Sequence, residues 1–240
     1  MKQIPVDILG HSFTLFDEDK SETINLVKHE FTSTAYNLFF GALVTDTPKI
    51  VLDVGAHVGI FSHLMAKKFP TSQVYAIEAT KRNFSNLLKS IELNGLTNIE
   101  AHNYMIWNNQ EIPHLLMAED NTGSASIGNY SHCIPVEVGE VLSLNELFKF
   151  LSLDKEQGSV VMKMDIERAE YDVLAKFKYW GAIDKLLLEV HWTELPPKAS
   201  SICDALNLLG FVNKNLEANK VFATMPFDSA FHSGAFLPVF

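Results

Sequence analysis

The stretch that decides the fold is KIVLDVGAHVG, residues 49–59. Its apolar run closes on Asp53, Val54 and Gly55, which is typical of a buried parallel strand that leads into a tight turn. The apolar segment that follows Gly59 ends at Pro70, and this spacing predicts a helix over 59–69. A strand, a glycine-containing turn and a helix form the first half of a βαβ unit.

The same alternation continues along the chain. We expect further strands at 73–79, 98–104, 159–165 and within 182–192, helices at 81–94, 143–151, 168–178 and 196–209, and two or three short strands in the tail. Strands that alternate with helices predict an open, mostly parallel α/β sheet with right-handed crossovers.

Two segments do not follow this rhythm. Residues 1–48 mix short apolar pieces with charge, and we expect an N-terminal extension made of a hairpin and a helix over 29–43. Residues 111–141 are rich in proline and glycine, which predicts one or two inserted β-hairpins. The predicted organisation is an extension over 1–48 and one domain over 49–240 that carries the insertion.

The composition argues against several classes of protein. Lys plus Arg number 19 and Asp plus Glu number 29, so the net charge of −10 disfavours a broad nucleic-acid-binding face. No apolar run reaches the roughly 18 residues of a membrane span, and Pro5 and Asp7 interrupt the stretch that a signal peptide needs. Cys133 and Cys203 fit neither a disulfide framework nor a zinc site. We expect a cytoplasmic protein without nucleic-acid or membrane partners, whose Phe-rich end (222–240) serves a homodimer contact or the core.

Ligands of such sheets bind beyond the carboxyl ends of the strands. The first of these ends lacks the dinucleotide pattern G-x-G-x-x-G, because His57 and Ile60 occupy two of its positions, and no P-loop follows. Glu78 ends the next strand at a spacing where a carboxylate accepts hydrogen bonds from a ribose. These features favour a nucleoside without phosphates, while a plain βα turn and a solvated glutamate are the structural alternatives.

Two further strand ends supply candidate groups for chemistry. In MKMDIERAEYDVL (162–174), Asp165 ends a strand and Glu167 lies where a helix starts. Glu189 and His191 are two residues apart and therefore share one face of the next strand. Asp165, Glu189 and His191 are expected to converge as a general base, as ligands of a hard divalent cation, or as a structural cluster.

The motifs are recognisable at this point. VLDVGAHVGIFS followed by YAIEAT resembles motif I and the acidic loop of class I S-adenosylmethionine-dependent methyltransferases. KMDIERAEYDVL with LLLEVHW is similar to the FkbM family of that class, whose usual form is K-x-D-x-E-G-A-E. The resemblance covers about residues 49–192, or up to 217 at its longest. It implies a Rossmann-like fold with a mostly parallel seven-stranded sheet and helices on both faces.

The resemblance also implies roles for individual residues. S-adenosylmethionine would be the cofactor, and no metal site is implied. The cofactor would be held by Asp53, Gly55, Ala56, His57, Gly59, Glu78, Ala79, Asn103 and Trp107. Asp165 would orient or deprotonate the acceptor hydroxyl, with His191 as the second candidate, while Glu167 and Glu189 would steer the acceptor.

Two positions depart from the family pattern. Arg168 replaces the usual glycine, so that Arg168 and Glu170 become candidates for contacts with the acceptor, which could then be anionic. Asn145 replaces the aspartate of a Leu-Asp-x-Leu stretch, and any role of that carboxylate is not carried over.

The expected function is O-methylation of a small metabolite, chiefly a sugar, nucleotide-sugar or glycan unit, because FkbM members mostly methylate hydroxyl groups of polyketides, sugars and other small metabolites. A polyketide acceptor is the nearest alternative, and a non-catalytic cofactor-binding or scaffold module is the alternative of another class. A nicotinamide-dependent dehydrogenase is disfavoured by His57 and Ile60. A nucleic-acid methyltransferase is disfavoured by the charge and by the turn D-I-E-R. The extension and the insertion are expected to cover the acceptor.

Overall fold

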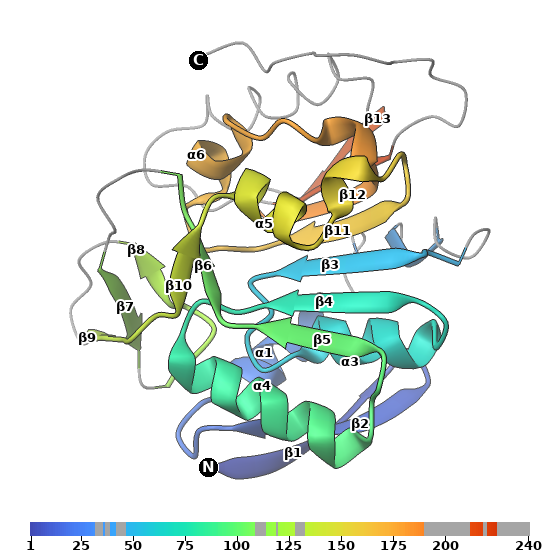
Figure 1. The fold of residues 1–240 in the computed structure, drawn as a ribbon. Helices are drawn as coiled ribbons and strands as arrows, with labels where there is room; N and C mark the ends of the chain where they lie inside the picture. The colour runs from blue at the N-terminus through green and yellow to red at the C-terminus, as the bar shows by residue number, and fades with distance from the viewer. Residues whose placement is uncertain are drawn as a thin grey trace.

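The computed structural model describes residues 1–31, 36, 39–41, 47–108, 114–118, 120–127, 133–189, 212–217 and 220–224. The centre of the molecule is a seven-stranded sheet in the order β13-β14-β12-β11-β3-β4-β5 (Figure 1). Its parallel strands are β3 (Ile50–Val54), β4 (Gln73–Ile77), β5 (Ile99–His102), β11 (Val160–Met164) and β12 (Ile183–Glu189). The predicted α/β class and parallel sheet are confirmed.

The edge of the sheet beyond β12 is antiparallel. Strand β14 (Lys220–Thr224) pairs antiparallel with both β12 and β13 (Val212–Glu217). On the opposite side of the sheet, the chain runs from β3 outward to β4 and β5, and it returns to pair β11 with the free side of β3. The strand order therefore reverses between β3 and β11, which is the switch point where ligands of such sheets bind.

Helices cover both faces of this sheet. Figure 1 shows α3 (Ile60–Lys68) and α4 (Lys81–Asn94) on one face, with α5 (Leu144–Phe150) and α6 (Glu170–Leu174) on the other. All residues of β3 and β11 are buried, because helices pack on both sides of these two strands. Successive side chains of a strand point to opposite faces, so Leu52 and Met162 pack with the α5 side, while Val51 and Val161 pack with the α3 side.

Two predicted elements differ from the observed ones. Helix α6 has five residues because Glu167 and Arg168 adopt left-handed conformations, with φ of 51° and 87°, so the helix begins only at Glu170. The strand predicted over 98–104 ends at His102, and the chain then leaves the sheet to form β6 (Tyr104–Ile106), which pairs in parallel with β10 (Glu140–Leu142).

The N-terminal extension is part of the same hydrophobic core. Strands β1 (Lys2–Ile8) and β2 (His11–Asp17) form the predicted hairpin, and α1 (Thr23–Glu30) follows. The predicted helix over 29–43 lies mostly outside the described residues, of which 36 and 39–41 are helical. Phe13 and Leu15 of β2 are buried in one cluster with Phe61 and Leu64 of α3. The extension therefore packs onto the domain rather than standing apart from it.

The insertion forms a small sheet of its own. Strand β7 (Leu115–Ala118) pairs antiparallel with β8 (Ser126–Ile127) on one side and with β9 (Cys133–Pro135) on the other. An isolated bridge between Thr80 and Val138 connects the end of the insertion to the start of α4. Within the described parts of the chain, no helix is both long and apolar enough to cross a membrane.

Candidate functional site

A cavity of about 230 Å³ lies at the carboxyl ends of β3, β4 and β11. Its lining includes the predicted cofactor residues Gly55, Ala56, His57, Glu78 and Ala79. Three predicted catalytic residues, Asp165, Glu167 and Glu189, line it as well. The structure therefore brings the strand ends together around one space, while His191 lies outside the described residues.

The turn after β3 is shaped by the close approach of another backbone. Gly55 has a φ of 82°, and a Cβ atom added there would lie 1.7 Å from the carbonyl oxygen of Asp165. Only glycine lacks the Cβ that this approach excludes. Gly59, with a φ of 94°, is the N-cap of α3, and a Cβ there would meet Leu87 of α4 at 2.5 Å. Gly55 borders the cavity, whereas Gly59 shapes it through helix packing.

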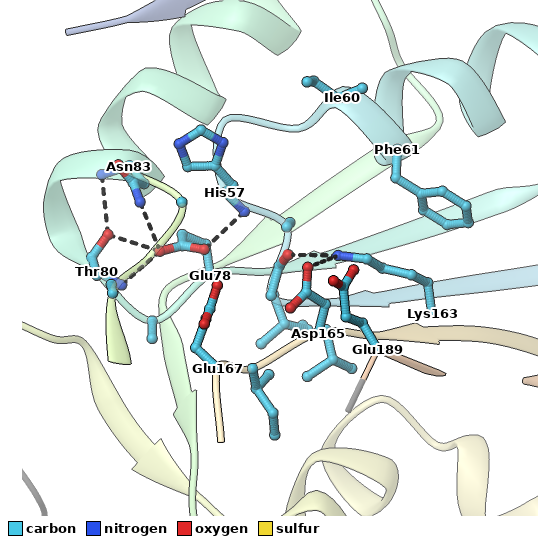
Figure 2. Close-up of a pocket in the computed structure, with 18 of the residues that line it drawn as sticks. His57, Ile60, Phe61, Glu78, Thr80, Asn83, Lys163, Asp165, Glu167 and Glu189 are labelled. Atoms are coloured by element: carbon cyan, nitrogen blue, oxygen red, sulfur yellow. Dashed lines mark hydrogen bonds and ion pairs between the residues drawn. The ribbon is translucent and has the colours of Figure 1, made fainter. Parts of the chain in front are cut away.

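Glu78 is anchored from two directions. The backbone N–H of His57 donates to Oε2 of Glu78 at 2.8 Å, and the backbone N–H of Thr80 donates to Oε1 at 2.9 Å (Figure 2). The Thr80 hydroxyl donates to the same Oε1 at 2.7 Å. Glu78 is only 5% exposed, and its burial raises the pKa of the carboxyl, while these hydrogen bonds oppose the rise. The alternative of a solvated glutamate is wrong.

Asp53 supports the turn from behind the cavity. Its side chain is fully buried and accepts a hydrogen bond from Ser62 Oγ at 2.5 Å, and Lys163 Nζ lies 3.8 Å from its Oδ1. Burial raises the pKa of Asp53, and the charge of Lys163 opposes this rise. Asp53 is not among the residues that line the cavity. Its contribution to a cofactor site is to hold the turn and Lys163 in place.

Lys163 is a charged residue of the site that the sequence interpretation missed. It is 8% exposed, lines the cavity, and donates from Nζ to the Gly55 carbonyl at 3.1 Å and to Asp165 Oδ2 at 3.3 Å. Burial alone would lower its pKa, but Asp165 and Asp53, with smaller contributions from Tyr36 and Glu189, raise the pKa above its ordinary value. The available signal was a lone charge within the apolar strand VVMKM.

One part of the cavity lining is charged and consists of Lys163, Asp165 and Glu189. Figure 2 shows the carboxylates of Asp165 and Glu189 close to the Lys163 ammonium, with Glu167 nearer to Glu78. The predicted convergence of Asp165 and Glu189 is therefore observed. Among the described residues, no three His, Cys, Asp or Glu side chains are arranged to hold a metal ion.

Glu170 and Arg168 do not line the cavity. Glu170 is 1% exposed, and its carboxylate accepts hydrogen bonds from the backbone N–H of Ile166 and of Arg168, each at 3.1 Å. These bonds stabilise the left-handed turn at residues 167 and 168. The expectation that Glu170 contacts the acceptor is replaced by a role in holding this turn.

Asn103 and Trp107 also contribute from outside the cavity. The Asn103 amide donates to the carbonyl oxygens of Glu78 and Ala79 at 2.9 and 3.0 Å, which fixes the end of β4. Trp107 packs against the core of the α5 side. The cavity is instead lined by the three residues of β6, Tyr104, Met105 and Ile106. The cavity lining from this segment thus ends one residue before Trp107, which was expected to hold the cofactor.

The extension and the insertion both reach the cavity. Thr23, Phe31 and Tyr36 line it from the first segment, and Asn121 and Ala125 line it from the second. The sequence predicted that these two segments would cover the site. It gave no means to name the residues, because the segments carry no motif and their contacts depend on tertiary packing.

The sequence is similar to that of known methyltransferases. A profile described as the methyltransferase FkbM domain matches residues 53–213, which is more than half of the chain. "Methyltransferase 1" of Beauveria bassiana (strain ARSEF 2860) is 27% identical over an alignment of 158 residues, and the match covers 58% of this chain and 64% of that protein. The match thus spans less than two thirds of the length of this relative.

Solved structures of similar fold include two methyltransferases. A precorrin-6y C5,15-methyltransferase from Geobacter metallireducens has a TM-score of 0.45 at 11% identity, covering 88% of this chain and 97% of its own. A SAM-dependent methyltransferase from Aquifex aeolicus has a TM-score of 0.44 at 12% identity, covering 88% of this chain and 100% of its own. On the strength of the profile match, the chain belongs to the FkbM family of methyltransferases, whose methyl donor is S-adenosylmethionine.

Proposed function

We propose that the protein transfers the methyl group of S-adenosylmethionine to a hydroxyl group of a small metabolite. The observation that carries this proposal is that Asp165 and the Glu78-anchored turn line one cavity. A contact between Gly55 and the Asp165 backbone fixes the distance between them. The family supplies the reaction type, and the position of Asp165 supplies a proton acceptor for it.

The residues around the first turn fit an unphosphorylated nucleoside. The Glu78 carboxylate has about four lone-pair directions, and its Oε2 accepts one hydrogen bond from the described residues, so it can accept a ribose hydroxyl as well. Tyr104, Met105 and Ile106 offer an apolar wall for a base. Lys163 is the one Lys or Arg among the described lining residues, and two carboxylates neighbour it. A phosphate group would find little support there.

Asp165 is our candidate for the residue that acts on the acceptor hydroxyl. When bound, the cofactor supplies an activated methyl carbon, so the protein must position the acceptor oxygen and remove its proton. Asp165 would take up the proton of the acceptor hydroxyl at a carboxylate oxygen as that hydroxyl receives the methyl group. Lys163 fixes Oδ2 of Asp165 and keeps the carboxylate oriented. A placed base of this kind adds about 10²–10⁴ in rate.

The charge of the cavity supports a neutral polyol as the acceptor. Four carboxylates line it, those of Glu78, Asp165, Glu167 and Glu189, against the single ammonium of Lys163 among the described residues. Carboxylates accept hydrogen bonds from sugar hydroxyls and repel phosphates and uronates. We therefore favour a neutral sugar or glycan unit over an anionic acceptor, and the absence of Arg168 from the lining agrees with this choice.

The test combines cofactor binding with an acceptor panel. Calorimetry of the purified protein should detect binding of S-adenosylhomocysteine and none of NADH. Incubation with a deuterated methyl donor and a panel of neutral sugars, uronates, nucleotide-sugars and polyketides should give a mass-labelled ether on a neutral polyol. An absence of heat with S-adenosylhomocysteine would overturn the proposed function. Methylation confined to uronates or polyketides would overturn the acceptor class alone.

A further inference from the structure

The roof of the cavity contains a buried polar junction centred on Thr122. This residue lies in the insertion and is fully buried. Its Oγ1 is 3.0 Å from Asp17 Oδ1, 2.7 Å from His57 Nε2 and 2.9 Å from Ser21 Oγ. Its backbone carbonyl accepts a hydrogen bond from Asn83 Nδ2 at 2.9 Å. One residue therefore joins the extension, the insertion, the turn after β3 and the start of α4.

The protons of this junction can be assigned. A carboxylate accepts but does not donate, so the single Thr122 hydroxyl proton goes to Asp17. The Thr122 oxygen then accepts from His57, whose ring must carry its proton on Nε2. Burial lowers the pKa of His57 to about 4. The negative charges of Asp17 and Asp165 oppose this shift, and the positive charge of Lys163 adds to it. A neutral imidazole at physiological pH agrees with this assignment.

The junction reaches Glu78 along two routes. The backbone N–H of His57, whose ring contacts Thr122, donates to Glu78 Oε2 at 2.8 Å. Asn83 Nδ2, which donates to the Thr122 carbonyl, lies 3.5 Å from Glu78 Oε1. His57 also holds a left-handed backbone conformation, with a φ of 53°. Thr122 is thus one residue removed from Glu78 along both routes, and the route through His57 starts at its hydroxyl.

We propose that Thr122 is a positioning residue for the nucleoside end of the cofactor, because its hydroxyl fixes His57 and so couples the 120–125 segment to the Glu78 carboxylate. This role rests on the proposed function in that Glu78 is taken to contact the nucleoside. In the apo protein the hydroxyl sets the tautomer of His57. In the loaded protein it determines how firmly Glu78 is held.

Other bonds keep the 120–125 segment attached without the Thr122 hydroxyl. Thr23 Oγ1 donates to Asn121 Oδ1 at 2.9 Å, and the backbone N–H of Gly123 donates to Thr23 Oγ1 at 3.2 Å. The backbone N–H of Glu22 donates to the carbonyl of Asp120 at 2.9 Å. A Thr122→Val variant keeps the shape of the side chain and these bonds. It therefore separates the hydroxyl from the general packing of the roof.

The experiment compares wild type, Thr122→Ser and Thr122→Val by two measurements. Nitrogen-15 spectra of the apo protein report the protonation of the His57 ring, and calorimetry from pH 5 to 8 reports affinity for S-adenosylhomocysteine. In wild type and Thr122→Ser, His57 should stay neutral with its proton on Nε2 above about pH 4, with an affinity that varies little. In Thr122→Val, His57 loses its acceptor but still faces Asp17.

The hydroxyl-deleted variant should therefore bind the cofactor product more weakly. Because His57 loses the acceptor that fixes its ring, the turn that donates to Glu78 is held less firmly, and the affinity for S-adenosylhomocysteine should fall by about tenfold. Glu78, Lys163 and Asp165 are present in all these variants, so their charges do not confound the comparison.

Three results would overturn the proposal. These are a wild-type His57 ring without a proton on Nε2 in the apo protein, an unchanged affinity in Thr122→Val, and an equal loss of affinity in Thr122→Ser. The first is measured on wild type and needs no variant to fold. If wild type does not bind S-adenosylhomocysteine, the proposed function fails, while the apo spectra still decide whether Thr122 sets the tautomer of His57.

Discussion

Asp165 is the side chain on which turnover should depend most. Asp165→Asn keeps the shape of the side chain but removes the proton acceptor, so kcat should fall by about 10²–10⁴. The affinity for S-adenosylhomocysteine should change little, because Glu78 and the turn after β3 stay in place. Turnover with an identified acceptor, together with calorimetry, measures both. Asp172→Asn, at an exposed carboxylate of α6, is the matched control. A variant Asp165→Asn that keeps more than a third of wild-type kcat would remove Asp165 from the mechanism.

Arg168 provides a second prediction for a single residue. Its φ of 87° is a conformation that glycine adopts freely and that costs a residue with a Cβ about 1–3 kcal/mol. Arg168→Gly should be more stable than Arg168→Ala by about 1 kcal/mol, after the greater entropy of glycine in the unfolded chain is subtracted. Both variants lose the guanidinium, so their difference isolates the backbone. Urea unfolding measures it, and equal stabilities would show that the turn is not strained.

Single residues also show what the sequence could reveal. Gly55, Glu78, Asp165 and Glu189 were predicted because each ends a strand, and the ends of parallel strands meet at one edge of a sheet. Lys163 was missed because it precedes the strand end, and its partner Asp53 lies opposite it in the neighbouring strand. That pairing depends on sheet register, which is set only when the strands associate.

At the scale of elements, the N-terminal hairpin is held to α4 by polar contacts as well as by the core. Asn94 Oδ1 accepts from the backbone N–H of Thr14 at 3.0 Å, and its Nδ2 donates to the Thr14 carbonyl at 2.7 Å. Asn94→Ala removes both bonds and should lower the free energy of unfolding by about 2 kcal/mol. It should also speed amide exchange at Thr14. Glu92→Ala, at an exposed position on the same helix, is the control, and equal effects of the two substitutions would contradict the prediction.

Element boundaries followed the sequence wherever local signals decide them. The helix predicted over 81–94 is observed with these bounds as α4, because its caps are local: Thr80 supplies a side-chain acceptor and Gly95 a left-handed backbone within one turn of each end. Helix α6 is shorter than predicted because the left-handed turn at 167–168 and buried Glu170 set its start. The spacing of apolar residues, from which the helix was predicted, reveals neither feature. The predicted boundary between extension and domain at residue 48 also rested on local signals alone. The sequence does not reveal that β2 and α3 share one core, because that is a tertiary contact.

For the whole molecule, the part of the stability that depends on His57 and His63 should fall as the pH falls from 7 to 5. The pKa of His57 is lowered from 6.5 to about 4 in the folded protein, and burial lowers the pKa of His63 in the same direction. At these two histidines the unfolded chain binds more protons than the folded one in this window, so their titration favours unfolding in acid. The raised pKa values of Asp53 and Glu78 act in the opposite direction. His57 is partly buried, so its share should be about 1–2 kcal/mol. Urea unfolding at the two pH values tests this.

The matched variant for this prediction is His57→Asn. Asparagine tolerates the left-handed conformation that His57 adopts and does not titrate. The variant should lose the part of the pH dependence that His57 causes and keep the part that His63 causes. The same pH dependence in His57→Asn and wild type would show that His57 does not titrate as its surroundings indicate.

The contact between Gly55 and the Asp165 carbonyl has a consequence for changing what the enzyme accepts. Because main chain touches main chain there, substitutions of side chains on either loop cannot change the spacing between Asp165 and the turn proposed to hold the cofactor. New acceptor preferences, whether they arise in evolution or in a laboratory library, would have to come from substitutions in the extension and the insertion. Tyr36, Asn121 and Ala125 are such positions. The backbone contact between Gly55 and Asp165 would stay the same in every such variant.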